Sequence, residues 1–438
     1  MRLRAFLLAA LGSLLLPTSL PAAALPQPLT LEQALQLADS SHPLVARSQA
    51  ELEAANARLL RANGSDDLEI RALLDARWVE PPTIAPQDHD DSRAGLIIDK
   101  RLYDFGQTRN SIEAARLSAA GRKALLELAR RRLRLEVMRR FFDVLLADLE
   151  FARENEDMAI VYVRLDKARE RNRLGQLSDI DLLQIETRYQ EVRDRRQAAE
   201  ARQRLARQRL ALLLGRPDDL PDELVPPELD LDRTLPDYPQ LLEQALAHNP
   251  ELVALREELA AAGKALEAAR ASDNPVISGR VEATHYQRSF GSRDPFSASL
   301  AIDIPLYVGE RTRAEEATAW ARLRETQARL KEKEYSLREQ LLEAWQQVQT
   351  LNSRRELAAT NTDYRDLYLD RSRIRYEQEL TTDLGDAMVA QSEARLLSRR
   401  TDYQLALAWA TLDLLTGRIP FAPAGTPVPE TTPQEDTP

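Results

Sequence analysis

Residues 96–103 read LIIDKRLY, and residues 300–307 read LAIDIPLY. The two stretches are offset by 204 residues (from 103 to 307), and the same offset relates Asp179 to Asp383. Each stretch belongs to one of two alternating, strand-like segments in its half of the chain, and a very long segment of helical composition follows it. Because this period far exceeds the roughly 20–50 residues of solenoid repeats, the sequence predicts a duplicated half-protein.

Four segments show the period-two alternation of β-strands, at residues 68–80, 94–105, 275–286 and 296–307. Segments of this length are typical of strands that cross a bilayer at a tilt. In lipid every backbone polar group must be paired, so strands of this kind must close into a barrel. Such a barrel has at least about eight strands. One chain supplies only four, and copies must therefore combine. The alternative is a soluble sheet of two hairpins with one wetted face.

The polar positions of these strands are expected to face the lumen of the barrel. They are Glu69, Arg71, Asp75, Arg77, Asp99, Arg101, Arg280, Glu282 and Asp303.

The remainder of each half is predicted to be helical. A helix precedes each strand pair, with breaks at His42-Pro43 and Asn249-Pro250, and a long helical hairpin follows it, at 108–214 and 310–416. In the second hairpin Leu337, Leu341, Ala344, Val348 and Leu351 recur at the spacing of a coiled-coil seam. The predicted fold class is mainly α with membrane β.

Composition supports export rather than an ordinary globular enzyme. Charged residues make up 30%, aromatic residues 5%, and cysteine is absent. Residues 1–24 resemble a secretory signal, and removing their two arginines changes the net charge from −10 to −12. An acidic exported chain is a poor candidate for nucleic-acid binding.

The domains expected are a first repeat over 25–216, a Pro/Asp-rich linker over 217–237, a second repeat over 238–418 and a disordered tail over 419–438.

The chain resembles the TolC-like outer-membrane efflux proteins in several motifs and in the order in which they follow one another. They are LEQAL at 31–35 and again at 242–246, the strand-to-helix transitions after Tyr103 and Tyr307, the turn LGQLSDIDLL at 174–183, and the helix ends LGR at 214–216 and TGR at 416–418. The resemblance implies a homotrimer in the outer membrane of a Gram-negative bacterium. Its twelve-stranded β-barrel would continue into a periplasmic α-barrel made of the helical hairpins.

The resemblance also implies a passive export channel that docks on a periplasmic adaptor (membrane fusion) protein and an inner-membrane pump of the RND, ABC or MFS class. Acidic residues would narrow the periplasmic gate, here Asp383 and Asp386, with Asp179 as the counterpart in the first half. The hairpin tips would contact the adaptor: Leu174, Gly175, Gln176, Leu177, Ser178, Leu380, Thr381 and Thr382.

Two departures from the family pattern concern the gate. The second tip has Glu379 where the first has Gly175, and Gly385 where the first has Asp181. The acidic residues also have a simpler interpretation, because acids in the first turn of a helix favour its dipole.

Other functions lack a site in the sequence. The four histidines have no metal-ligand spacing, and no phosphate loop or nucleophile elbow is present, so neither cofactor nor metal is expected. The main alternative is a periplasmic coiled-coil adaptor or scaffold of an export system without its own pore. The cargo cannot be read from the sequence.

Overall fold

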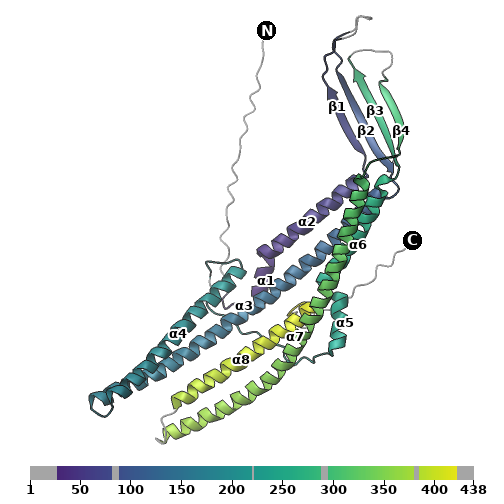
Figure 1. The fold of residues 1–438 in the computed structure, drawn as a ribbon. Helices are drawn as coiled ribbons and strands as arrows, with labels where there is room; N and C mark the ends of the chain where they lie inside the picture. Colours follow the sequence, from purple (N-terminus) through teal and green to yellow (C-terminus); the bar gives the residue numbers. More distant parts are fainter. Residues whose placement is uncertain (1–26, 81–87, 220, 288–293, 379–383, 422–438) are drawn as a thin grey trace, which may run out of the picture.

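The computed structural model describes residues 27–80, 88–219, 221–287, 294–378 and 384–421. It is mostly helical, with one four-stranded sheet at the end of a layer of long helices (Figure 1). The predicted signal segment over 1–24 lies outside the described residues, as does the predicted tail from residue 422 onward. The start of that tail is ordered, however, because Phe421 packs against the core and its carbonyl oxygen accepts a hydrogen bond from Arg134.

The two halves of the chain repeat the same order of elements. The first half contains α1 (Leu31–Ser41), α2 (Pro43–Gly64), β1 (Glu69–Asp75), β2 (Arg93–Tyr103), α3 (Gln107–Arg173) and α4 (Asp179–Leu213). The second contains α5 (Tyr238–His248), α6 (Pro250–Arg270), the short η1 (Ala271–Asp273), β3 (Val276–Tyr286), β4 (Phe296–Asp303), α7 (Arg311–Glu377) and α8 (Leu384–Leu415).

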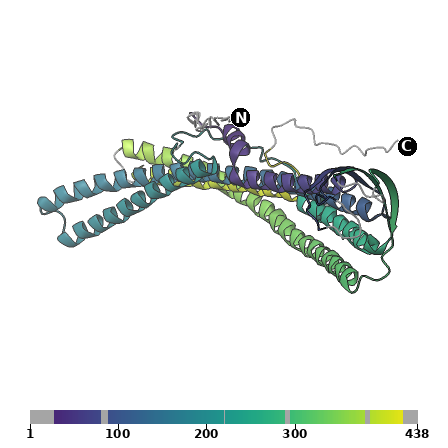
Figure 2. The same cartoon turned by 90° about the horizontal axis from the view of Figure 1, so that it is seen from above.

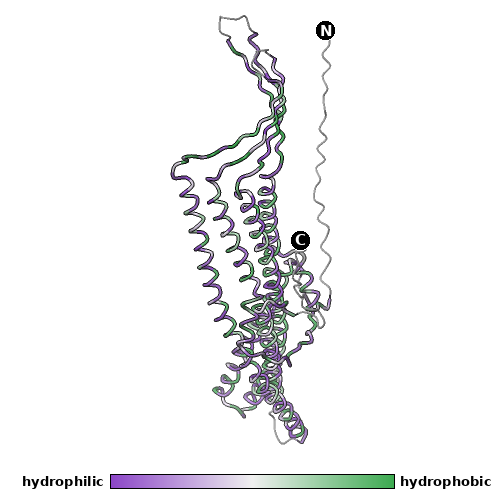
Figure 3. The backbone as a smooth tube through the Cα atoms, turned by 90° about the vertical axis from the view of Figure 1, so that its right-hand side faces the viewer, coloured by the Kyte–Doolittle hydropathy of each residue, from purple (hydrophilic) through white to green (hydrophobic). Residues whose placement is uncertain are grey.

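The sheet has the order β1-β2-β3-β4, and each neighbouring pair is antiparallel. Two strands are shorter than the sequence predicted. β1 ends at Asp75 because its partner Arg93 is the first residue of β2, and only an isolated bridge from Trp78 to Asp90 follows. β4 ends at Asp303, close to Pro305, which has no backbone N–H to donate to a strand ladder. Figure 3 shows hydrophobic and hydrophilic residues interspersed along all four strands.

Each half begins with a helix that is interrupted before a proline. His42 precedes Pro43, and its Nδ1 accepts a hydrogen bond from the backbone N–H of Leu44 at 3.2 Å. Asn249 precedes Pro250, and its Oδ1 accepts from Glu251 N at 3.1 Å and Leu252 N at 3.2 Å. Proline fits the first position of a helix because its missing N–H would be unpaired there in any case. Both breaks therefore lie where the sequence predicted them.

The long helices α3 and α7 have 67 residues each and begin 204 residues apart, at 107 and 311. At 1.5 Å per residue each spans roughly 100 Å. The predicted seam of α7 is confirmed, since all five of its residues are at most 4% exposed. They pack in one core with Phe141 and Phe142 of α3 and with α8, where Phe142 stacks on Tyr403 at 4.5 Å between ring centroids.

The described part of the linker, residues 217–219 and 221–237, forms no helix or strand of its own and packs against the helices. Leu224 pairs with Leu29 in a parallel bridge, and Leu224 and Leu231 are buried. Further on, the linker contacts one side of α7 and α8 through Asp232, Arg233 and Pro236. The helix α1 projects from one side of the helical layer (Figure 2).

Candidate functional site

The strand register places the predicted polar residues on one face of the sheet. In an antiparallel pair, residues directly opposite each other share a face. In one row across the sheet, Asp99 of β2 lies between Glu69 of β1 and Arg280 of β3. In the next row, Ile97 of β2 lies between Arg71 of β1 and Glu282 of β3. By the same alternation Asp75, Arg101 and Asp303 lie on this face. Arg77 lies beyond the end of β1, where its side chain is 3.8 Å from Asp91.

Charges on this polar face are paired across three strands. Asp99 Oδ2 accepts from Arg71 of β1, and Asp99 Oδ1 accepts from Arg280 of β3, both at 2.6 Å. Nearer the far end of the sheet, Arg93 donates to Asp75 at 3.1 Å. A carboxylate held between two arginines joins the three strands, and Glu69, 3.4 Å from Arg71, balances the second arginine.

Apart from Lys100 and His285, the opposite face of the sheet is apolar, and it is uncovered. Leu74 is 83% exposed and Leu300 is 67% exposed. The same face carries Ile70, Leu96, Phe296 and Ile302, all exposed. Within the described residues, β1 and β4 have no partner on their outer edges. Exposed apolar surface and open strand edges of this extent indicate contact with another molecule or with lipid.

The turn from strand to helix is built differently in the two halves. Asp104 follows β2 and accepts from Thr108 N at 2.8 Å, while Gly106 has φ 100°. Burial alone raises the pKa of Asp104, but hydrogen bonds from Thr108, Arg101 and Gly106 outweigh it and hold that pKa below its usual value. In the second half the position 204 residues later is Val308, and Thr312 instead donates to Asp273 at 2.7 Å.

The first hairpin tip is a compact turn at the end of α3. Gly175 has φ 71°, and its N–H donates to Asn172 O at 2.9 Å. Ser178 is the N-cap of α4, and the Asn172 side chain donates to Asp179 Oδ1 at 2.8 Å. Asp179 is therefore fixed within its own turn. Beside it Ile180 is 81% exposed and Leu183 is 60% exposed.

These two apolar residues, Ile180 and Leu183, were not among the predicted tip contacts, which ended at Ser178. Their signal was present in the sequence, because they are apolar residues of the turn at 174–183, as the predicted Leu174 and Leu177 are.

The second tip is only partly described. Leu380, Thr381, Thr382 and Asp383 lie outside the described residues. Asp386 is described, and its Oδ1 lies 2.8 Å from Arg164 Nη2 on α3. Because Arg164 precedes the end of α3 by nine residues, Asp386 sits roughly 15 Å along α3 from the tip that holds Asp179. The structure thus joins Asp386 to the first hairpin and does not bring it to Asp179 of the same chain.

Further contacts join α3 to α8 near Arg164 and Asp386. Ser392 Oγ donates to Glu156 Oε2 at 2.5 Å, and Arg153 Nη1 lies 3.8 Å from Glu393. A Cβ on Gly385 would lie 2.7 Å from Ile160 Cγ2, so glycine permits the close approach of the two helices. We call these four contacts, including Arg164–Asp386, the inter-hairpin seam.

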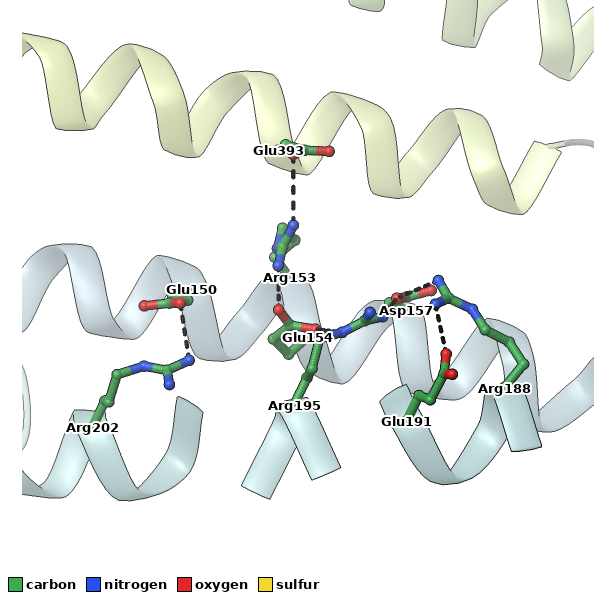
Figure 4. A network of polar contacts seen from close by, with 9 residues as sticks. All are labelled: Glu150, Arg153, Glu154, Asp157, Arg188, Glu191, Arg195, Arg202 and Glu393. Atoms are coloured by element: carbon green, nitrogen blue, oxygen red, sulfur yellow. Dashed lines mark hydrogen bonds and ion pairs between the residues drawn. The ribbon is translucent and has the colours of Figure 1, made fainter. Parts of the chain in front are cut away.

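A buried carboxylate connects the seam to the first hairpin (Figure 4). The Glu154 side chain is only 3% exposed and contacts Arg153 on α3 and Arg195 on α4, the latter at 3.4 Å. Arg195 also donates to Asp157 at 2.8 Å. The sequence did not single out Glu154, because nothing local distinguishes it from the many solvated acids of the helices.

Within the described residues, no three histidine or acidic side chains are arranged to hold a metal ion. None of the helices described here combines the length and the hydrophobicity that a bilayer-crossing helix requires.

Comparison with known proteins gives one family. Residues 241–418 match the family described as "Outer membrane efflux protein". The chain is 24% identical over 274 residues to the outer membrane efflux protein BepC of Brucella suis biovar 1 (strain 1330), which covers 61% of this chain and 58% of BepC. The chain thus aligns with somewhat more than half the length of this relative.

Solved structures resemble the whole described chain. A membrane protein from Pseudomonas aeruginosa superposes with a TM-score of 0.74 at 17% identity, covering 91% of this chain and 95% of that one. The CmeC outer membrane channel of Campylobacter jejuni gives a TM-score of 0.74 at 13% identity, covering 88% and 85%. The fold is shared, and the predicted resemblance to the TolC-like family is confirmed.

Proposed function

We propose that this chain is a TolC-like outer-membrane efflux protein and forms a passive export duct across the outer membrane and the periplasm. The observation that carries the proposal is the four-stranded sheet, with one charged face, one exposed apolar face and two open edges. A sheet of this kind is stable in hydrocarbon only when its edges are closed and its polar face is turned away from lipid.

Three copies provide the closure. Twelve strands are enough for a barrel with a water-filled interior, whereas the four of one chain are not. The face carrying Asp99 and Arg280 would then line the lumen, and the face carrying Leu74 and Leu300 would contact lipid. The helical hairpins would extend the duct into the periplasm, with the sheet in the outer membrane of a Gram-negative cell.

The far ends of the hairpins are the proposed docking region for a periplasmic adaptor. Leu174 is 59% exposed at the first tip, near the exposed Ile180 and Leu183. Exposed apolar side chains on a turn that is rigidly capped by Ser178 suit a helical partner, because the partner would not have to order the turn. An inner-membrane pump would supply the energy for transport through the duct.

The inter-hairpin seam is the proposed closure of the periplasmic entrance. Arg164–Asp386 is a contact at 2.8 Å between side chains that are 44% and 65% exposed, so each side chain remains hydrated when the pair opens. Exposed pairs of this kind are typically worth less than about 1 kcal/mol. Such a contact fixes the resting position of α8 and still permits an adaptor to open it.

Conductance in a planar bilayer tests the duct. We expect purified wild-type protein to insert and conduct weakly, and the double variant Arg164→Ala/Asp386→Ala to conduct several times better. A matched control is Arg173→Ala, which removes an exposed arginine that pairs with Glu170 on its own helix. Absence of conductance in the wild type and in the double variant would reject the duct.

Fractionation separates the duct from a pore-free periplasmic scaffold. A duct must sediment with outer membranes and require detergent for release. A scaffold whose sheet is wetted on both faces would leave the cell on osmotic shock, and that result would support the alternative.

A further inference from the structure

A cavity with two arginines opens midway along the helical layer. It lies between α3, α7 and α8 and has a volume of about 450 Å³, within the roughly 300–1,000 Å³ of small-molecule sites. Arg139 of α3 and Arg354 of α7 both line it, together with Gln347 and Gln404. We call this cavity the arginine groove.

The floor of the arginine groove is apolar. Leu351 and Ala408 line it and are each 3% exposed, so they present buried aliphatic surface at its base. Thr350 and Thr411 lie at its polar margin. A groove with an aliphatic base and cationic and amide groups above it matches a molecule that has an apolar body and a negative charge.

The arginines have unused capacity to bind an anion. Arg139 Nη1 donates to Glu136 at 3.2 Å, and Arg140 contacts both Glu136 at 2.8 Å and Asp143 at 3.6 Å, so Arg139 uses one guanidinium nitrogen for a carboxylate that it shares. No described residue forms an ion pair or a side-chain hydrogen bond with Arg354. Guanidinium groups present several N–H donors in a plane and favour carboxylates and similar anions.

The groove opens on the side of the layer opposite to the linker. On α8, Asp402, Trp409 and Asp413 face the linker or the side chains that contact it. Gln404 follows Asp402 by two residues and Thr411 follows Trp409 by two residues, and each step is roughly 200° of rotation around the helix. The two groove residues therefore lie on the other side of α8.

The stripes of α7 are arranged in the same way. Trp345 donates to Pro236 O at 3.0 Å, and Arg355 contacts Asp232, whereas Gln347, Thr350 and Arg354 form a separate stripe that lines the groove. A duct must keep its interior clear, and the linker together with α1 forms added bulk on one side of the layer (Figure 2). That side is therefore the outside, and the arginine groove faces the lumen.

We infer that the arginine groove binds small organic anions with an apolar body as they pass through the duct. This inference rests on the proposed duct, which determines the side of the layer that meets cargo. The site is open and partly hydrated, and the Arg139 side chain is 51% exposed, so binding is weak and release is fast. Conduction requires this balance, because a cargo that binds tightly would block the path.

The test uses 1-naphthoate as the anion and 1-naphthamide as a neutral molecule of the same shape. Both are titrated by calorimetry into the full-length protein in lipid nanodiscs. We expect wild type to prefer the anion and Arg139→Gln/Arg354→Gln to bind it about tenfold more weakly, equivalent to the loss of one charge-assisted hydrogen bond. Binding of the amide should not change.

The control variant is Arg130→Gln/Arg338→Gln, which removes the same charge from the same two helices. Arg130 pairs with Glu127 three residues earlier, as Arg139 pairs with Glu136, but lies half a turn away from it around α3. A second groove variant, Thr350→Glu, adds a carboxylate without removing an arginine and should also weaken naphthoate binding. Equal naphthoate affinity in wild type and both groove variants, or an equal loss in the control, would overturn the inference.

Conductance of the same proteins keeps the two proposals separate. If wild type conducts and the groove variants bind naphthoate as wild type does, the groove is rejected and the duct stands. If wild type binds naphthoate through the two arginines but neither wild type nor the Arg164→Ala/Asp386→Ala variant conducts, the duct is rejected and the anion site stands.

Discussion

The two helical hairpins begin with helices of equal length but are joined in different ways. In the first hairpin, ion pairs connect α3 and α4 along most of the length of α4. They are Arg169–Glu186 at 2.9 Å, Arg195–Asp157 at 2.8 Å, Arg202–Glu150 at 3.0 Å and Arg207–Asp148 at 2.7 Å. In the described part of the second hairpin, the ion pairs between α7 and α8 are Arg355–Asp402 at 3.4 Å and Arg395–Asp366 at 4.0 Å.

The second hairpin is instead held by its apolar core. Leu337, Leu341 and Val348 of α7 and Leu405 of α8 are 0% exposed. This packing lies in the middle of the molecule, where α7 and α8 meet α3, and the two ion pairs between α7 and α8 lie beyond it toward the tip. The comparison indicates that ion pairs within the first hairpin fix it along its length, whereas the end of the second hairpin is held to α3 by the inter-hairpin seam.

The largest expected effect comes from the apolar core. Leu341→Ala should lower the free energy of unfolding by about 3 kcal/mol, because it removes a fully buried side chain and leaves a cavity. The measurement is the denaturant midpoint of helix loss followed by circular dichroism. Leu342→Ala is the matched control, since Leu342 is the next residue and is 40% exposed. Equal losses for the two variants would contradict the assignment of the core to this stripe.

A smaller effect is expected from the ion-pair ladder of the first hairpin. Arg195→Ala removes a cation that buried Glu154 shares with Asp157. Among the described residues, Arg153 is then the remaining ion-pair partner of Glu154. We expect a loss of about 2 kcal/mol, typical of a buried polar group that loses a partner. Arg204→Ala, at a 72% exposed arginine paired within its own helix to Glu200, should cost under about 0.5 kcal/mol. The idea of a fixed first hairpin fails if the two losses are the same.

The smallest effect concerns the pH dependence of an ion pair in the second hairpin. Burial raises the pKa of Asp402, although Arg355 and Arg399 each favour its charged form. A folded-state pKa above the unfolded value of about 3.9 means that the folded protein binds more protons in the window above about pH 4. The contribution of Asp402 to stability is therefore present below that window and lost as pH rises through it.

Asp402→Asn cannot titrate and should lack this decline. The difference between the wild-type and variant unfolding midpoints, measured at several pH values from 4 upward, should thus move in favour of the variant as pH increases. A difference that stays constant, or that moves in favour of wild type, would show that the pair with Arg355 stabilises the second hairpin after all.

Local pattern and duplication were sufficient to predict much of this fold. Alternation in the stretch at 96–103 located β2, and the prolines after His42 and Asn249 located both helix breaks. The ends of β1 and β4 were missed, because the end of a strand depends on where its partner begins and on Pro305 beyond it.

Contacts between distant helices could not be predicted. Arg164 and Asp386 are separated by more than two hundred residues, and nothing in the sequence says which acid faces which arginine. The same holds for buried Glu154 and for the arginine groove, which exist only once three helices from both halves are packed together.

The most direct test of the account is the number of copies in the membrane-extracted assembly. Native mass spectrometry of protein released in detergent should give three chains, the number needed for twelve strands. A single folded chain that remains in aqueous buffer without detergent would contradict the account, because its apolar sheet face and open strand edges would then need neither lipid nor another copy.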